Sequence, residues 1–252
     1  MLKIKKFLKY EKCIKCKKEF LSIGVKRINE KEVICNHCSN EELYSTKNSE
    51  TIGKPTQISC SFEFETNKKE NYLFELTKYG FIGCYDGSIR GSEWKSPIYN
   101  NRKSFHVACK KLDKFKSYVG KNCGTHLHVG TKYKDKIQDY QYELFEPILQ
   151  EMRDNKDITK KFWGRYFNSY CEGYIRDYTR YNAFNTMSSV ETLEFRLLKF
   201  KNSKQYIRVA DFCIDTTKYI NYHIEKENFD IQKAKKIGQI ILKKYKEVTQ
   251  NV

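Results

Sequence analysis

The chain has 252 residues, of which 39% are hydrophobic and 15% aromatic, and this excludes an intrinsically disordered protein because it supplies enough apolar surface for a buried core. No apolar run approaches the roughly 20 residues that a membrane-spanning helix needs, and the charged start MLKIKKFLKYEK lacks the apolar centre of a secretory signal. We therefore expect a protein of the cytoplasm with one or two domains.

The formal net charge of +17 points to nucleic acid as a partner, because phosphate contacts require clustered lysines and arginines. The basic residues are 39 lysines and only 9 arginines, although arginine is the residue that usually reads phosphates and bases through paired hydrogen bonds. The charge is also spread out, with 12 basic and 7 acidic residues among the first 50. We favour a solvated basic surface and keep nucleic acid as an alternative partner.

Four cysteines near the start form two pairs, each with two residues between its members, and 18 residues separate the pairs. They are Cys13, Cys16, Cys35 and Cys38. Such spacing brings four thiolates to the corners of a tetrahedron, the geometry of structural zinc; His37 is an alternative ligand in the second pair. We predict a zinc ribbon over residues 1–45, a polar linker over 46–56 and a main domain over 57–252. The ribbon would bind nucleic acid or protein, or brace its neighbour.

Four segments of the main domain combine β-prone apolar residues with regularly placed polar ones, which predicts strands. They are Ile58–Glu65, Asp86–Pro97, Asn122–Gly130 and Val190–Phe200. Because residues two apart in a strand point to the same face of the sheet, acids and imidazoles project together. The pairs are Glu63 with Glu65, His126 with His128, and Glu194 with Arg196. Glu93 falls on a strand that returns from a tight turn at Asp86. Each group also has an ordinary interpretation, as glutamates that face water or a plain salt bridge.

Helical periodicity predicts six helices around these strands and therefore an α+β fold. They are Lys69–Tyr79, Asn101–Val119, Ile137–Arg153, Lys160–Tyr170, Ser203–His223 and Asp230–Val248. Pro147 either kinks its helix or opens the second half of it, and Ser203 and Asp230 are expected N-caps. A loop rich in Tyr, Arg and Asn spans Glu172–Met187, and it either closes over a substrate or is simply exposed.

The acids and imidazoles of the polar faces suit hard divalent ions such as Mg²⁺ or Mn²⁺. They are Glu63, Glu65, Glu93, His126, His128 and Glu194. Such clusters commonly hold nucleotide phosphates, whose charge the metals offset. The sequence contains neither GxxxxGK[ST] nor GxGxxG, which excludes P-loop and Rossmann binding. A nucleotide would then be held through the metals and an arginine such as Arg196.

The order of the four motifs FEFE, DGSIRGSEWKSP, CGTHLHVG and ETLEFRLL resembles the amidoligases of phages and fungi. These belong to the glutamine synthetase and γ-glutamylcysteine synthetase superfamily of carboxylate–amine ligases. The resemblance covers roughly residues 57–220. It implies a glutamine synthetase-like antiparallel sheet that forms a cup for metal and ATP, with helices packed on its other face. If a phage encodes the chain, the host cytoplasm is the expected location.

The resemblance also implies roles for individual residues. The magnesium ligands would be Glu63, Glu65, Glu93, His126 and Glu194. The residues at the nucleotide or substrate would be Arg196, His128 and Asn185. The catalytic residues would be Arg196, Glu63 and Glu194. The implied reaction activates a carboxylate as an acyl phosphate with ATP, and an amine then attacks and forms an amide. The chain departs from the family before the first Glu-x-Glu, where a Cys-Ser-Phe run replaces the usual glycine.

Two other functions stay open. The net charge and the ribbon favour a nucleic-acid-binding protein whose ligase-like domain is a non-catalytic scaffold. A metal-dependent hydrolase would use the same carboxylates without ATP. The retained carboxylates beside Arg196 favour the ligase, with a protein tail, an amino acid or a modified base as substrate. Glutamine synthetase-like domains can complete their sites across subunits, so an oligomer is compatible with the resemblance, and no membrane partner is expected.

Overall fold

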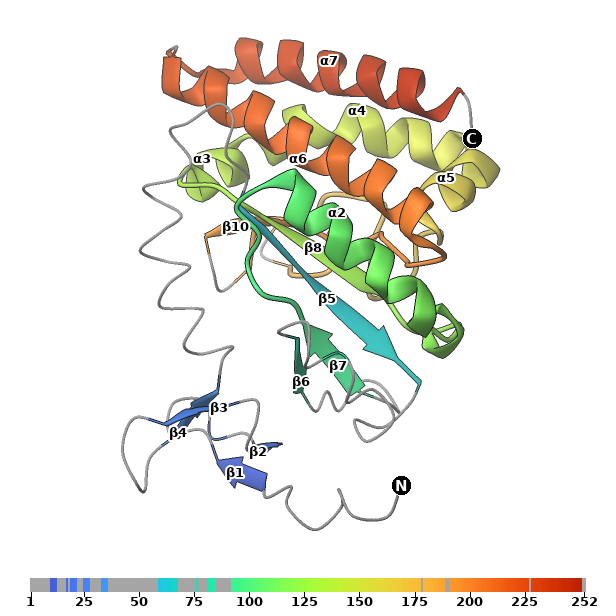
Figure 1. Ribbon diagram of the computed structural model, residues 1–252. Helices are drawn as coiled ribbons and strands as arrows, with labels where there is room; N and C mark the ends of the chain where they lie inside the picture. Colours follow the sequence, from blue (N-terminus) through green and yellow to red (C-terminus); the bar gives the residue numbers. More distant parts are fainter. Residues whose placement is uncertain are drawn as a thin grey trace.

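A six-stranded antiparallel sheet forms the centre of the structure (Figure 1). The computed structural model describes residues 10–12, 17, 19–21, 25–27, 33–35, 59–67, 76, 81–84, 92–177, 179–188, 191–226 and 228–250. In spatial order the strands are β6 (Ile82–Cys84), β7 (Ser92–Lys95), β5 (Cys60–Thr66), β8 (Thr125–Gly130), β10 (Thr192–Phe195) and β9 (Phe184–Asn185). Each of the four segments predicted from alternation contributes a strand to this one sheet, and the expected α+β class is confirmed.

Strand β5 illustrates why these segments form a sheet with two different faces. Its apolar residues Cys60, Phe62 and Phe64 are at most 1% exposed, whereas Ser61 and Glu63 between them are half-buried. The period of two sends the apolar side chains to the helices and the polar ones to the opposite face. Phe62 makes edge-to-face contacts with Phe105 at 5.8 Å and with Tyr206 at 5.6 Å between ring centroids.

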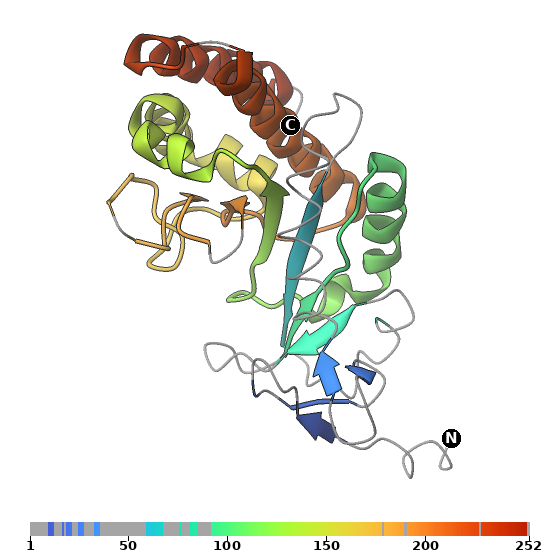
Figure 2. The same ribbon diagram turned by 90° about the vertical axis from the view of Figure 1, so that its left-hand side faces the viewer.

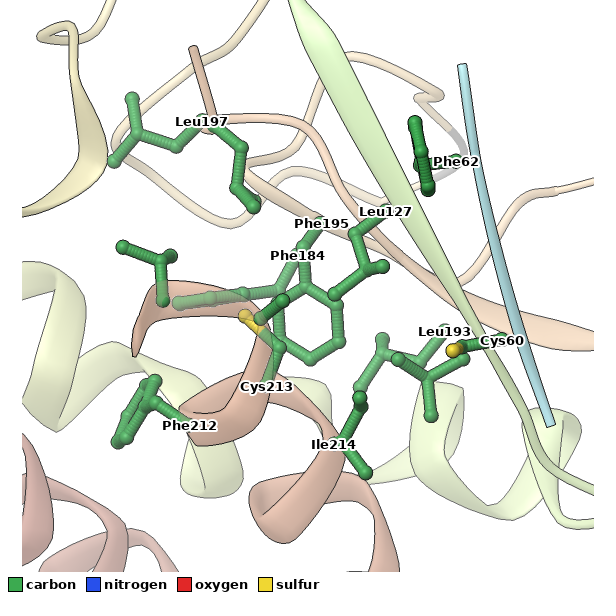
Figure 3. Close-up of a cluster of buried hydrophobic side chains, with 14 of the residues drawn as sticks. Cys60, Phe62, Leu127, Phe184, Leu193, Phe195, Leu197, Phe212, Cys213 and Ile214 are labelled. Atoms are coloured by element: carbon green, nitrogen blue, oxygen red, sulfur yellow. The ribbon is translucent and has the colours of Figure 1, made fainter. Parts of the chain in front are cut away.

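Two helices and a 3₁₀ turn pack against the apolar face of the sheet (Figure 2). They are α2 (Arg102–Lys111), the 3₁₀ helix η5 (Leu112–Tyr118) and α6 (Ser203–Lys226). Side chains of β8, β9 and β10 meet α6 in this layer (Figure 3). The labelled residues of that contact are Leu127, Phe184, Leu193, Phe195, Phe212, Cys213 and Ile214. The predicted helix over Asn101–Val119 is thus confirmed as α2 followed by η5.

Four further helices complete the helical side of the structure. They are α3 (Lys134–Asp139), α4 (Gln141–Asp154), α5 (Lys156–Trp163) and α7 (Ile231–Thr249). Helices α4 and α7 pack closely, because a Cβ atom on Gly238 would lie only 2.2 Å from the Glu143 carbonyl oxygen. The predicted N-cap of α7 is confirmed, since the Asp230 side chain accepts a hydrogen bond from the Lys233 N–H at 2.9 Å.

The helix expected over Lys160–Tyr170 is wrong in its position. Helix α5 ends before Gly164, which adopts a left-handed conformation with φ of 92°. A Cβ atom at Gly164 would lie 2.3 Å from the Lys199 carbonyl oxygen, so a larger residue does not fit this turn. The chain after Gly164 therefore leaves the helix and lines the site described below.

Two other helix predictions need smaller corrections. The helix expected over Ile137–Arg153 consists of α3 and α4, separated at Tyr140, and Pro147 lies inside α4 without ending it. Asn202, rather than Ser203, caps α6, because the Asn202 side chain accepts a hydrogen bond at 2.9 Å from the backbone N–H three residues on.

The predicted zinc ribbon lies largely outside the described residues. Within it, β1 (Tyr10–Lys12) pairs with β2 (Glu19–Leu21), and β3 (Val25–Arg27) pairs with β4 (Val33–Cys35), both antiparallel. The four cysteine side chains, the linker, the tight turn at Asp86 and, apart from Leu76, the helix over Lys69–Tyr79 fall outside the described part, so they stay predictions. None of the described helices is both long and apolar enough to cross a membrane.

Candidate functional site

The polar face of the sheet carries a continuous row of acids and imidazoles. Cross-strand pairing places Glu63 of β5 between His126 of β8 and Lys95 of β7. One step along, His128 of β8 pairs with Glu194 of β10. Paired residues of neighbouring antiparallel strands have Cβ atoms about 5 Å apart, so the register of the sheet brings these groups together.

The same register extends the row in both directions. Glu65 pairs with Glu93 of β7 towards one edge, and Glu194 pairs with Asn185 of β9 towards the other. Arg196 follows β10 directly and is 6% exposed. The structure thus brings together on one face all the sheet residues predicted for the site, while their roles in ligand binding stay predictions. They are Glu63, Glu65, Glu93, His126, His128, Asn185, Glu194 and Arg196.

Glu63 is the centre of this row. One carboxylate oxygen lies 2.9 Å from Lys95 Nζ and 3.7 Å from His128 Nε2. The other lies 3.3 Å from His126 Nδ1. Burial disfavours the ionised carboxylate, but the ammonium of Lys95 and the two imidazoles outweigh it and hold the pKa of Glu63 well below its ordinary value. Glu63 is therefore ionised at neutral pH.

Glu194 is the most deeply buried carboxylate of the row, at 4% exposure. Its Oε1 atom accepts a hydrogen bond from Arg196 Nη1 at 2.6 Å and lies 3.3 Å from His126 Nδ1. Its Oε2 atom accepts from Asn185 Nδ2 at 2.6 Å. Burial raises the pKa of Glu194, but the charges of His128, His126 and Arg196 outweigh burial, so the pKa lies below its ordinary value.

Glu65 and Glu93 form the other end of the row. Glu65 accepts a hydrogen bond from the Gly124 N–H through Oε2, and its Oε1 lies 3.7 Å from His126 Nε2. Glu93 Oε1 lies 3.3 Å from Lys95 Nζ. Lys95 therefore contacts two carboxylates, Glu63 and Glu93.

The donor set fits a divalent cation. One ligand atom each from Glu63, His128 and Glu194 lies within 4.8 Å of the other two, and two carboxylates with an imidazole suit Mg²⁺ or Mn²⁺. His128 Nδ1 is 3.1 Å from Thr192 Oγ1, whereas Nε2 is buried without a hydrogen-bond partner. A buried polar atom without a partner is costly, and a bound cation would satisfy it.

His128 also responds to the charge around it. Burial favours the neutral imidazole, but the contact with Glu63 and the charge of Glu194 outweigh burial and raise the pKa of His128.

A cavity of about 620 Å³ lies over Glu63, Glu65, Glu93 and His126 of the acidic row and has a basic and aromatic wall. Most of the wall comes from the chain between α5 and β10, which lies on the side of β8 away from α2 (Figure 2), and the rest comes from the segment just before β8. Its members are Lys121, Asn122, Arg165, Asn168, Ser169, Tyr170, Arg180 and Tyr181. The cavity therefore combines a floor that attracts cations with a wall that attracts anions.

Arg165 is the part of this wall that sequence reasoning missed. Its guanidinium lies beside Gly124, where an added Cβ would be 3.0 Å from Arg165 Nη1 and from His126 Nε2. It donates a hydrogen bond to the Arg196 carbonyl oxygen, and its Nε atom is buried without a partner. Within the described ranges no carboxylate lies within 4.0 Å of Arg165. The position of Arg165 depends on the turn at Gly164. The helix predicted over Lys160–Tyr170 would have placed the Arg165 side chain elsewhere, so it was not identified from the sequence.

Lys95 was missed as well, although its signal was available. It stands two residues after Glu93 in the same strand, so it necessarily points to the same face.

No family model, curated protein or solved structure matches the chain. The likeness to amidoligases therefore depends on the four sequence motifs alone.

Proposed function

We propose that the protein is an ATP- and Mg²⁺-dependent carboxylate–amine ligase, an amidoligase that acts through an acyl phosphate. The observation that carries this proposal is the row of four glutamates and two histidines on one face of an antiparallel sheet, part of which lines a cavity with an arginine-rich wall. A glutamine synthetase-like cup with helices on the opposite face is the architecture that the motifs imply, and an α+β fold with its helices behind the sheet is compatible with it.

The proposed reaction has two steps. A carboxylate oxygen of the substrate attacks the γ-phosphorus of ATP, a P–O bond forms, and the bond to the leaving ADP oxygen breaks. An amine nitrogen then attacks the acyl carbon, a C–N bond forms, and inorganic phosphate leaves with the electrons of the broken C–O bond. The amine loses one proton, so the products are an amide, ADP, phosphate and a proton.

The residues of the row have distinct proposed roles. Glu63, His128 and Glu194 would hold the divalent cation, with His126 beside them, and Glu65 and Glu93 extend the acidic surface. A bound cation supplies positive charge that offsets the phosphate oxygens during transfer. Asn185 is 1% exposed and donates to Glu194, while its Oδ1 accepts from the Met187 N–H at 2.8 Å. We therefore assign Asn185 to orienting Glu194 rather than to direct contact with the nucleotide.

Arginines of the wall would bind the phosphate groups. Arg196 is already paired with Glu194 and also donates to the Tyr170 carbonyl oxygen at 3.3 Å, so only part of its guanidinium faces a ligand. Arg165 lines the same cavity, and among the residues that the structure describes it has no such carboxylate partner. We propose that Arg165 and Arg196 together contact the transferred phosphoryl group, where fixed positive charge stabilises developing negative charge.

Hydroxylamine trapping tests the function without knowledge of the natural amine, because hydroxylamine converts an acyl phosphate to a hydroxamate. The full-length chain is incubated with ATP, Mg²⁺, hydroxylamine and panels of amino acids, peptides and other carboxylates. We expect ADP and hydroxamate in equal amounts with one class of carboxylate. Glu63→Gln should abolish both products.

Glu225→Gln is the matched control, because Glu225 forms a surface ion pair with Lys132 at 3.6 Å. This variant should retain both products. Phosphate release without hydroxamate would indicate a hydrolase instead, and no ADP with any panel would contradict the ligase.

A paired substitution tests the arginine wall. Arg165→Met should weaken ATP binding about tenfold or more, because a hydrogen bond to a charged group contributes about 1.5–3 kcal/mol. Arg176→Met is the control, since Arg176 is exposed and pairs with Glu172 at 3.1 Å. Equal affinities of the two variants would remove Arg165 from the phosphate site.

We also propose that Cys13, Cys16, Cys35 and Cys38 bind one structural zinc ion. The supporting observations are the two short antiparallel pairs around these cysteines and the left-handed conformation of Lys17, φ of 60°, directly after Cys16. A non-glycine residue in that conformation persists only where its surroundings enforce it. Elemental analysis should find one zinc per chain, and none after Cys13→Ser with Cys16→Ser. Zinc retained in that variant would contradict the assignment.

A further inference from the structure

The side chain of Lys95 lies among the carboxylates of the acidic row instead of projecting into solvent. We call this row, with its glutamates Glu63, Glu65, Glu93 and Glu194, the cup. Its Nζ atom is 2.9 Å from Glu63 Oε1 and 3.3 Å from Glu93 Oε1, and its side chain is 20% exposed. An ammonium that contacts two carboxylates occupies the position in which a bridging divalent cation would otherwise bind.

The sheet fixes this placement through two separate constraints. Lys95 pairs with Glu63 across the β5–β7 ladder, and it stands two residues from Glu93 along β7. Both relations put the three side chains on one face at neighbouring positions. The contact therefore follows from the backbone register.

The charges of the cup agree with one additional divalent cation. Its carboxylates are Glu63, Glu65, Glu93 and Glu194, and the lysine and arginine side chains paired with them among the described residues are Lys95 and Arg196. Four negative and two positive side chains leave a formal charge of −2 when both histidines are neutral. One divalent ion neutralises that charge, whereas a second would leave a buried excess of positive charge beside an ammonium, which is unfavourable.

We propose that the cup binds a single divalent cation, at Glu63, His128 and Glu194, and that the Lys95 ammonium takes the place of a second one between Glu63 and Glu93. Glu93 then holds Lys95 and is not itself a metal ligand. This inference rests on the cup that the proposed function uses, but it concerns the number of bound ions and not turnover.

Electron paramagnetic resonance of Mn²⁺ tests the proposal on the full-length chain without ATP, because zinc bound elsewhere gives no signal. Titration should end at one Mn²⁺ per wild-type chain. Lys95→Met should bind two, since removing the ammonium vacates a position next to two carboxylates. Lys121→Met is the control, because it removes the same charge from the wall of the same cavity, and it should bind one.

Two further measurements keep the test independent of the folding of Lys95→Met. The wild-type spectrum should show an isolated Mn²⁺ ion, because two ions about 3.5–4 Å apart would couple magnetically. Glu93→Gln should keep its single Mn²⁺ with an affinity within about threefold of the wild type, since the neutral amide removes a carboxylate that contacts Lys95 but does not bind the ion.

Several outcomes would overturn the proposal. These are no Mn²⁺ or two coupled Mn²⁺ ions in the wild type, equal stoichiometry in Lys95→Met and the wild type, or loss of the ion in Glu93→Gln. Because no nucleotide or substrate is present, these outcomes are independent of whether the chain is a ligase.

Discussion

The two faces of the central sheet are built from alternate residues of the same strands, yet they differ in almost every property. On one face, Phe62, Leu127 and Phe195 are at most 1% exposed and pack against helices. On the other face, Glu63, His126 and Glu194 are mostly buried, and carboxylate oxygens of Glu63 and Glu194 lie within 4.8 Å of each other. The apolar face gains free energy from burial, whereas burying charged groups costs free energy unless other groups offset it.

This difference indicates that alternate residues of each strand have different roles. The fold is stabilised by the apolar face, and the polar face is retained for binding a ligand. Substitutions on the first face should therefore change stability, and substitutions on the second should change ligand affinity with little loss of stability. The predictions below test that separation, starting with the largest effect.

On the apolar face, Phe62→Ala should lower the free energy of unfolding by about 3–5 kcal/mol, because it removes a fully buried ring and leaves a cavity. The ring contacts with Phe105 and Tyr206 would also be lost. Denaturant unfolding followed by circular dichroism measures this change. A loss below 1 kcal/mol would mean that the core does not depend on this face as described.

On the polar face, Glu63→Gln with Glu194→Gln should reduce Mn²⁺ affinity by about 100-fold or more, since two charged ligands become neutral. The same variant should unfold at a denaturant concentration closer to that of the wild type than Phe62→Ala does, because Gln preserves the shape of the side chains. Mn²⁺ affinity is measured by calorimetry and the denaturant midpoint by unfolding, both on the same protein sample. A stability loss as large as that of Phe62→Ala would contradict the division between the faces.

Gly124→Ala tests how closely the wall approaches the floor. The added methyl group would lie 3.0 Å from both Arg165 Nη1 and His126 Nε2, so Arg165 must shift by a few tenths of an ångström. We expect about tenfold weaker ATP binding, or about 1.4 kcal/mol, with an unfolding midpoint near that of the wild type. Unchanged affinity would show that Arg165 is not positioned by this contact.

Thr192→Val gives the smallest expected effect. It removes the hydroxyl that contacts His128 Nδ1 at 3.1 Å and keeps a side chain of similar shape. Groups that orient a metal-binding histidine typically affect metal affinity about 10- to 100-fold, and we expect the lower end of that range for Mn²⁺. An affinity equal to that of the wild type would indicate that the sheet alone orients the imidazole.

The alternation of polar and apolar residues was sufficient to predict four strands of the sheet and most of the polar face, whereas β9 lies within the segment that was expected to be a loop. Glu63 was assigned to the same face as Glu65, and His126 to the same face as His128, from their spacing alone, because strand periodicity is independent of tertiary context. Which residues meet across the sheet could not be predicted, since cross-strand register depends on the whole sheet.

The wall of the cavity was the least predictable part. Arg165 lies on an irregular segment that begins where Gly164 ends α5, and such segments have no periodicity to read. The apolar and aromatic residues around it favoured a helix over Lys160–Tyr170, and the close approach of Lys199 to Gly164 overrode that preference. The cap at Asn202 was misplaced by one residue, because both Asn202 and Ser203 are good N-cap residues.

Calorimetric titration of ATP into the full-length chain tests the central claim most directly, with Mg²⁺ and again with a chelator. We predict micromolar binding that requires Mg²⁺ and is lost in the variant with both Glu63→Gln and Glu194→Gln. Absence of ATP binding to the wild type, or binding that the double variant retains, would contradict the assignment of the acidic row as a metal and nucleotide site.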